Sequence, residues 1–268
     1  MSIIQAIILG IIQGLTELLP ISSSAHLNII PWLLDWTKSE EFVKAFEGFD
    51  VALHVGTLLA IGIFFFKDWV NLAKGGYELV IKKKKSVEGR MFWYLVAATI
   101  PAAVAGLAME LLIGDVLDGI PIITALALII MGVLLFIADE KSKSTVKFKQ
   151  MTFKQSFLIG LSQCLALIPG FSRSGTTITT ARLLGIERKS AAKFSFLLST
   201  PIVLAATVLK FKDFVLSPEF FVGVFVSFIV GIFVIKVLLN YLQKGSYKAF
   251  AIYRIIFGLV IIAAIFIK

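Results

Sequence analysis

The sequence predicts an all-α integral membrane protein with six transmembrane helices plus two re-entrant helical hairpins, arranged as an inverted-topology repeat. Three observations predict this fold. First, 58% of the 268 residues are hydrophobic and only 16% are charged, with a mean hydropathy of +0.94, whereas soluble domains are roughly half apolar and about a quarter charged. Second, apolar stretches of membrane-spanning length recur along the chain. Third, two such stretches are broken by proline and polar residues. We expect one membrane domain covering 1–268.

Six apolar segments are long enough to cross a bilayer, which takes about 17–25 residues of helix. They are 50–66, 91–112, 119–138, 191–210, 218–238 and 249–267. Two further apolar stretches, 1–34 and 153–184, are interrupted by LLPISSSAH and LIPGFSRSGTT. A broken helix at membrane depth is tolerated only where it faces protein or a water-filled cavity. Both stretches are therefore predicted to be re-entrant helical hairpins.

The charges between these segments predict the topology. Basic residues, among them Arg182 and Arg254, gather in 67–90, 139–154, 182–193 and 236–254, whereas 35–50 and 113–118 are acidic through residues such as Glu47, Asp115 and Asp118. Basic segments face the cytoplasm in membrane proteins. The two kinds of segment alternate only if each hairpin returns to the side from which it came, which places both termini outside. The net charge of +9 then reflects membrane topology, and we expect no nucleic-acid partner.

A short internal repeat supports the inverted arrangement. LGIIQGL (9–15) aligns with IGLSQCL (159–165), which pairs Gly10 with Gly160 and Gln13 with Gln163. The pseudo-repeats are 1–140 and 150–268, each with one hairpin followed by three spans. Because three is odd, the two halves must insert upside down relative to each other, and such folds place their site near the midplane, where broken helices meet.

Two classes of feature are not expected. The single cysteine, Cys164, excludes an intrachain disulfide framework and a multi-thiolate metal site. The first residues lack the basic region of a secretory signal peptide, so we expect no cleavable signal peptide.

The first broken segment, QGLTELLPISSSAHL from Gln13 to Leu27, carries candidate acid–base residues. Gln13 and Glu17 share a helix face, and a carboxylate in a membrane segment is a functional candidate by default. The alternative is that Glu17 forms a structural ion pair with Arg173. His26 follows the serines by one turn, so it is placed to share a proton with a serine hydroxyl. His54, in VALHVGTLLA, is interpreted as an ordinary hydrogen-bonded histidine.

The second broken segment, PGFSRSGTT from Pro169 to Thr177, predicts an anion site. A helix that begins after a break presents unpaired N–H groups, and the planar guanidinium of Arg173 matches phosphate oxygens. The candidate phosphate ligands are Ser172, Arg173, Ser174, Gly175, Thr176 and Thr177.

Together the two segments predict a phosphate grip facing an acid–base set inside the membrane, which suits a lipid phosphate whose tail lies between the spans. A transporter or flippase for a phosphate-bearing lipid or anion is the main alternative, because inverted repeats with paired broken helices are also a transporter architecture. A purely structural scaffold does not explain an arginine at mid-membrane.

These two segments resemble the signature motifs of the bacterial undecaprenyl-diphosphatase family, also called bacitracin-resistance proteins. The first motif is (E/Q)-x-x-x-E followed by P-x-S-S-x-x-H, and the second is P-G-x-S-R-S-G-x-T. The resemblance extends over the whole chain. It implies a multi-pass enzyme of the bacterial plasma (inner) membrane that hydrolyses undecaprenyl diphosphate to undecaprenyl phosphate and inorganic phosphate. This reaction recycles the lipid carrier for peptidoglycan synthesis. A homodimer is left open.

The resemblance also implies roles for individual residues. The expected catalytic residues are Glu17, His26, Ser23 and Arg173. The phosphates are expected to meet Ser22, Ser172, Arg173, Ser174, Gly175, Thr176 and Thr177. A divalent cation, Mg²⁺ or Ca²⁺, is implied as cofactor, held by Glu17 and Gln13. Two positions depart from the family pattern: Gln13 stands where many relatives have glutamate, and Ala25 where glycine is frequent. The motifs leave open whether His26 activates Ser23 or a water molecule.

Overall fold

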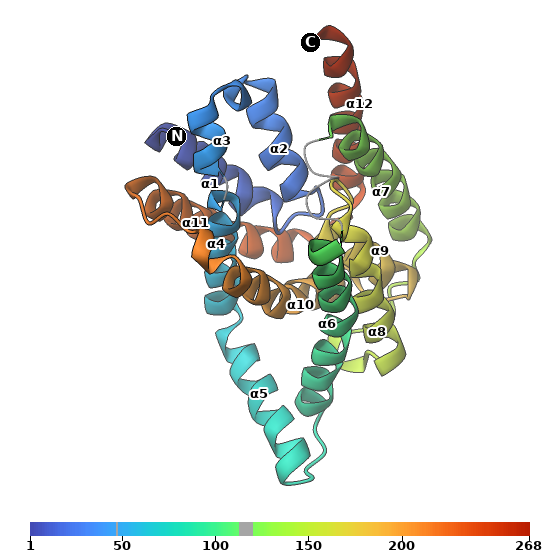
Figure 1. The fold of residues 1–268 in the computed structure, drawn as a ribbon. Coiled ribbons are helices and arrows are strands. Elements are labelled where there is room, and N and C mark those ends of the chain that lie inside the picture. The colour runs from blue at the N-terminus through green and yellow to red at the C-terminus, as the bar shows by residue number, and fades with distance from the viewer. Residues whose placement is uncertain (47, 113–119) are drawn as a thin grey trace.

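The fold is known from a computed structural model that describes residues 1–46, 48–112 and 120–268, and in these ranges the regular structure is helical, without a named strand (Figure 1). Glu47, Asp115 and Asp118, on which part of the topology prediction depends, lie outside the described residues, as does the first position of the predicted span 119–138.

Five helices are long and apolar enough to cross a membrane within the described part of the chain. They are α6 (Val87–Leu112), α7 (Pro121–Lys141), α10 (Arg188–Leu209), α11 (Pro218–Tyr241) and α12 (Lys248–Ile267). All five coincide with predicted spans. The sixth predicted span, 50–66, corresponds to α4 (Phe49–Phe64), which has only 16 residues. It passes the same test only when it is taken together with the short α3 (Glu40–Phe46), from which it is bent by 40°.

Both broken segments fold as two helices joined by a break. In the first, α1 (Ile3–Thr16) is followed by α2 (Ser23–Leu33). In the second, α8 (Phe153–Ser162) and the 3-10 helix η3 (Gln163–Leu167) are followed by α9 (Arg173–Leu183). Shorter 3-10 turns connect other elements: η1 (Trp36–Lys38), η2 (Phe148–Gln150) and η4 (Phe211–Asp213).

The two broken segments begin their helices in the same way. Ser22 and Ser172 cap α2 and α9 with backbone φ values of 78° and 70°, and each hydroxyl accepts a hydrogen bond from the N–H three residues later. Ser2 and Thr152 form capping boxes at the starts of α1 and α8. The members of each pair stand 150 positions apart, as Gly10 and Gly160 do. The similarity between the two halves therefore extends from sequence to backbone conformation.

Glycines set the packing of α1 and α8 on long helices. A Cβ added at Gly14 would lie 2.8 Å from the Ser227 carbonyl of α11, and one at Gly160 would lie 2.1 Å from the Ala98 carbonyl of α6. Such distances leave no room for a side chain, so α1 lies directly on α11 and α8 directly on α6.

One predicted connection is wrong. The segment 67–90 was expected to be a charged link between spans, but α5 (Phe66–Ile81) occupies most of it and packs against α6 at the lower end of the molecule in Figure 1. Leu72, Gly75 and Gly76 form its buried face. Residues at this spacing share one face of a helix. Two lysines of α5, Lys67 and Lys74, are exposed, and four more, Lys82 to Lys85, follow the helix. A count of charges over 67–90 therefore does not reveal the helix.

A buried charge cluster ties four helices together near the start of α10. Asp139 of α7 accepts hydrogen bonds at 2.8 Å from the Nε atoms of both Arg182 and Arg188, and at 2.9 Å from the backbone N–H of Tyr247. Arg182 is fully buried. Arg182, which was counted among the basic residues of 182–193, thus belongs to a buried ion-pair cluster.

Candidate active site

The breaks of the two hairpins meet in the interior of the protein. The Nη2 atom of Arg173, the first residue of α9, lies 2.7 Å from Oε1 of Glu17, which follows α1. Close by, the Ser174 hydroxyl donates to the Leu19 carbonyl at 3.1 Å. Because the segments join through an ion pair and a hydrogen bond to backbone, their relative position is tightly defined. The ion pair that the sequence offered as a structural alternative is thus formed.

Glu17 is the centre of the site. Its second oxygen, Oε2, accepts a hydrogen bond from the Ser23 hydroxyl at 2.6 Å and from Nε2 of Gln13 at 3.3 Å. Nε2 of His54 lies 3.4 Å from the same oxygen. The carboxylate is 6% exposed, and a buried charge requires such partners to remain ionised.

Glu17 and three of its partners, Ser23, His54 and Arg173, line a cavity of about 260 Å³. Its polar wall carries Glu17, Ser23, Ser24, His54, Ser172 and Arg173, and its apolar wall carries Val51, Ala166, Ile202, Val203 and Ala206. A cavity with a few convergent polar groups and an apolar side is typical of a ligand site. This composition suits a molecule with a charged head and a hydrocarbon chain.

The cavity also lies beside two helix N-termini. Ser23 and Arg173, which line it, are the first residues of α2 and α9. The first N–H groups of a helix lack intrahelical partners and attract anions. Arg173 adds a guanidinium that is held in place by the Ser195 carbonyl at 3.2 Å. The site therefore places positive charge and N–H donors next to the Glu17 carboxylate.

His26 does not take the position predicted for it. Its Nδ1 lies 2.7 Å from the Ser22 carbonyl and its Nε2 lies 2.7 Å from the Tyr253 hydroxyl. The ring also stacks on Phe257 of α12, with 4.4 Å between ring centres. Both nitrogens are thus engaged away from the cavity, and the expected proton-sharing pair of Ser23 and His26 is not formed.

His54 takes the place that was expected of His26. Its Nδ1–H donates to the Asp50 carbonyl at 2.8 Å, which turns Nε2 towards Glu17 and the cavity. Interpreting His54 as an ordinary histidine was therefore wrong. The rule that singled out Glu17, namely that an ionisable residue in an apolar membrane segment is functional by default, applies equally to His54.

The other predicted phosphate ligands build the breaks and do not line the cavity. The Ser22 hydroxyl caps α2 and lies 3.3 Å from that of Ser24. The hydroxyls of Thr176 and Thr177 donate to the Arg173 carbonyl at 3.0 and 2.8 Å. Ser174 bonds the first hairpin, as described above. These contacts orient the residues that do line the cavity.

Arg254 of α12 joins both breaks and was missed in the sequence. It is fully buried. Its Nη1 donates to the Pro20 carbonyl at 3.0 Å, and its Nη2 donates to the carbonyls of Gly170 at 2.8 Å and Phe171 at 3.0 Å. A Cβ at Gly175 would lie 2.7 Å from Nη1, so this glycine makes room for the guanidinium. An arginine within a predicted span was the available signal, but it was counted among the charges of the preceding connection.

The donor set beside Glu17 fits a divalent cation that is shared with a substrate. The described residues include no group of three or more His, Cys, Asp and Glu side chains that could hold a metal alone. However, Oε1 of Gln13 is buried without a hydrogen-bond partner beside the single carboxylate of the site. Mg²⁺ binds through one or two carboxylates together with substrate phosphates, so two protein oxygens are sufficient.

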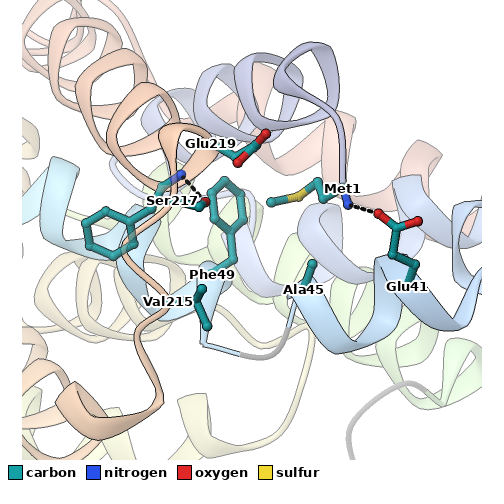
Figure 2. A pocket seen from close by; sticks show the side chains of 8 residues that line it. Met1, Glu41, Ala45, Phe49, Val215, Ser217 and Glu219 are labelled. Carbon is teal, nitrogen blue, oxygen red and sulfur yellow. Dashed lines mark hydrogen bonds and ion pairs between the residues drawn. The ribbon is translucent and has the colours of Figure 1, made fainter.

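A larger cavity of about 340 Å³ lies elsewhere, between the start of the chain and the start of α11 (Figure 2). It is lined by Met1, Glu41, Ala45, Phe49, Val215, Ser217, Glu219 and Phe220. The amino group of Met1 and the Glu41 carboxylate pair across one side at 3.3 Å. Its described lining includes the Ser217 hydroxyl but no arginine, whereas the cavity beside Glu17 has Arg173 next to three serines.

Comparison with known proteins identifies the family. A family model described as bacitracin resistance protein BacA matches residues 6–260. The chain is 45% identical over 265 residues to an undecaprenyl-diphosphatase of Pelotomaculum thermopropionicum, covering 98% of this chain and 96% of that protein. It is 44% identical to an undecaprenyl-diphosphatase of Caldicellulosiruptor bescii, covering 98% and 97% of the two chains, and 40% identical to that of Moorella thermoacetica over the full length of both. The chain belongs to the bacitracin resistance protein family.

Proposed function

We propose that this protein hydrolyses undecaprenyl diphosphate to undecaprenyl phosphate and inorganic phosphate, and so recycles the lipid carrier for cell-wall synthesis. The observation that carries the proposal is the Glu17 carboxylate, held between the Arg173 guanidinium and the Ser23 hydroxyl at 2.7 and 2.6 Å in a cavity with one apolar wall. A carrier that only binds and moves phosphate needs cationic groups and donors, whereas hydrolysis also needs a proton acceptor. A hydroxyl hydrogen-bonded to a carboxylate meets that need.

In this mechanism Arg173 and the first N–H groups of α2 and α9 bind the terminal phosphate. Phosphoryl transfer depends mainly on such positioning and charge stabilisation. The attacking oxygen forms a bond to the terminal phosphorus and loses its proton to Oε2 of Glu17. The bridging P–O bond breaks, and its electron pair leaves with undecaprenyl phosphate. The attacking oxygen belongs to Ser23 or to a water molecule, and Glu17 accepts the proton in both versions. When Ser23 attacks, a phosphoserine forms; a water molecule then bonds to its phosphorus, the bond between phosphorus and Ser23 Oγ breaks, and the water proton passes to Oγ, which restores the serine and releases inorganic phosphate.

The two histidines have different parts in this proposal. His54, when protonated on both nitrogens, pairs with the Glu17 carboxylate through Nε2 at 3.4 Å and keeps it oriented towards Ser23. His26 acts as a positioning residue, because it connects the Ser22 carbonyl at the start of α2 to the Tyr253 hydroxyl of α12.

A divalent cation, Mg²⁺ or Ca²⁺, is proposed as cofactor on the basis of the donor set. Glu17 and the unpartnered oxygen of Gln13 would hold it. When bound, it neutralises negative charge on the diphosphate oxygens.

We further propose six spans and two re-entrant hairpins in an inverted repeat, inserted in the bacterial plasma membrane with both termini outside. Two observations support the repeat. The caps at Ser22 and Ser172 match, and the two halves pack in an equivalent way, with α1 on α11 and α8 on α6. A homodimer stays a prediction, to be tested by mass determination of the purified protein in detergent.

The test is phosphate release from undecaprenyl diphosphate by purified protein. Glu17→Gln and Arg173→Ala are expected to lower kcat by at least about a hundredfold, the range seen when one transition-state contact is lost. Ser23→Ala is compared with Ser24→Ala, because both serines line the cavity but only Ser23 bonds Glu17. If protein in vesicles moves the lipid but releases no phosphate, the transporter alternative is correct.

Trapping labelled phosphate separates the two versions of the attack. If Ser23 is the nucleophile, acid quenching during turnover leaves label on the wild-type protein and none on Ser23→Ala. Unchanged turnover by Ser23→Ala assigns the attack to water.

A further inference from the structure

A further cavity, which is rich in lysine, lies at the junction of α4, α5, α10 and α11. This lysine pocket has a volume of about 290 Å³ and is lined by Phe64, Phe65, Asp68, Lys189, Lys193, Lys236, Leu239 and Asn240. None of these residues lines the cavity beside Glu17.

The lysine pocket has an excess of positive charge. Its single acid, Asp68, is paired with Lys193 at 2.6 Å. The Lys193 ammonium also lies over the rings of Phe65 and Phe148, at 5.8 and 5.2 Å from their centres, so its position is fixed. Lys189 and Lys236 make no ion pair with any residue that the structure describes. Two lysines from different helices therefore face one pocket without an anion between them.

A neighbouring pocket shows that this imbalance is local. It shares Asp68 and Lys193 with the lysine pocket but is completed by Glu88 and Lys149, which pair at 2.9 Å. In that neighbouring pocket each lysine is paired with a carboxylate, Lys149 with Glu88 and Lys193 with Asp68. The same region of the protein thus balances its charges in one pocket and leaves an excess in the other.

The position of the lysine pocket coincides with the ends of apolar helices. Lys189 is the second residue of α10, Asn240 is the second-last residue of α11, and Phe64 is the last residue of α4. The membrane boundary of this protein is expected at these helix ends. From the pocket, exposed apolar side chains continue along the outer surfaces of α4 and α11, including Ile63, Phe233 and Val237. Charged donors and an apolar surface therefore adjoin each other.

We propose that the lysine pocket binds the headgroup of an anionic phospholipid, with the phosphodiester between Lys189 and Lys236 and the acyl chains along α4 and α11. Basic pockets between transmembrane helices on the cytoplasmic side bind such headgroups, and lysine provides a flexible point charge for a phosphate. Asn240 supplies a neutral donor at the rim. A free phosphate has the charge but makes no use of the adjoining apolar surface. The site is independent of the catalytic proposal, since the two share no residue.

The test is native mass spectrometry of the full-length protein in neutral detergent, titrated with phosphatidylglycerol or with phosphatidylcholine. The wild type is expected to bind phosphatidylglycerol more tightly. Lys189→Gln/Lys236→Gln should weaken that binding about thirty-fold, from the known contribution of each basic residue near an anionic surface, and leave phosphatidylcholine binding unchanged. The matched control, Lys83→Gln/Lys85→Gln, removes the same charge from the exposed segment after α5 and should retain wild-type affinity.

Three outcomes would overturn the proposal: equal weakening in the two double variants, no weakening in either, or displacement of the lipid by millimolar inorganic phosphate. Thermal unfolding of each variant without lipid checks the fold, and the shift of the unfolding temperature on adding phosphatidylglycerol gives a second measure of binding. That shift should be smaller in Lys189→Gln/Lys236→Gln than in the control pair, and equal shifts would also refute the site.

Discussion

Replacing Arg254 by lysine tests whether one guanidinium holds the two breaks together. The substitution keeps the buried positive charge but removes the two separate Nη donors of the guanidinium. Nη1 serves Pro20 of the first hairpin, and Nη2 serves Gly170 and Phe171 of the second. A lysine has a single nitrogen, so it cannot reproduce this bridge. At least one hydrogen bond to a charged donor is then lost, at about 1.5–3 kcal/mol each.

In free energy, the catalytic effect should be similar in size to the effect on stability, because a hundredfold change in rate corresponds to about 2.7 kcal/mol. Pro20 and Gly170 lie in the breaks that position Glu17 and Arg173, and a misplacement of about 1 Å in such a site lowers the rate about a hundredfold. We therefore expect Arg254→Lys to fold, to unfold at a lower temperature in detergent, and to release phosphate from undecaprenyl diphosphate with kcat reduced about a hundredfold.

The control for this experiment is Arg90→Lys, the same substitution at an exposed position of α6. It should match the wild type in both measurements. Suppose that the kcat of Arg254→Lys lies within twofold of the control and that its unfolding temperature equals that of the control within error. The two breaks then do not depend on the guanidinium, and the reasoning is wrong.

Three further predictions follow from individual contacts. His54→Leu should lower kcat about tenfold to a hundredfold in the phosphate-release assay, because the Glu17 carboxylate loses a charge-assisted contact worth about 1.5–3 kcal/mol. His54→Gln should recover part of this activity. Wild-type activity of His54→Leu would show that the ring takes no part in the reaction. Gly175→Ala places a Cβ 2.7 Å from the buried guanidinium of α12 and should destabilise the protein by about 1–3 kcal/mol in denaturant unfolding, whereas Gly62→Ala, with no heavy atom within 4 Å, should not; equal stability of the two variants would contradict the packing. Asp139→Asn leaves two arginines without their shared carboxylate and should cost about 3–5 kcal/mol without changing KM, so a rise in KM with unchanged stability would be inconsistent with a structural role.

Much of the fold could be predicted because spans and breaks are local features. Apolar length identifies α6, α7, α10, α11 and α12, and Pro-Gly and Pro-Ile-Ser mark the breaks. The additional α5 was less accessible, because it buries little more than Leu72 and two glycines.

The site was predicted in part. Glu17 and Arg173 were identified because ionisable side chains are unusual at membrane depth, whereas Ser23 was implied by the family resemblance. The contact between the two breaks follows from the repeat. The choice between the two histidines could not be made from sequence. His54 reaches Glu17 because α4 lies beside α1. His26 turns away because its Nδ1–H donates to the Ser22 carbonyl and its Nε2 accepts from the Tyr253 hydroxyl of α12. Both facts depend on helix placement that no short motif encodes.

The caps at Ser22 and Ser172 have a consequence for how substrate enters. Both serines adopt positive φ, where a residue with a side chain is less stable than glycine by roughly 1–2 kcal/mol. Glycine would relax the backbone but would provide no hydroxyl for the helix that follows. A serine in this conformation restricts the backbone at the break between the two helices, where glycine would allow more conformations. The starts of α2 and α9 beside the cavity are therefore expected to keep their positions while substrate enters and product leaves.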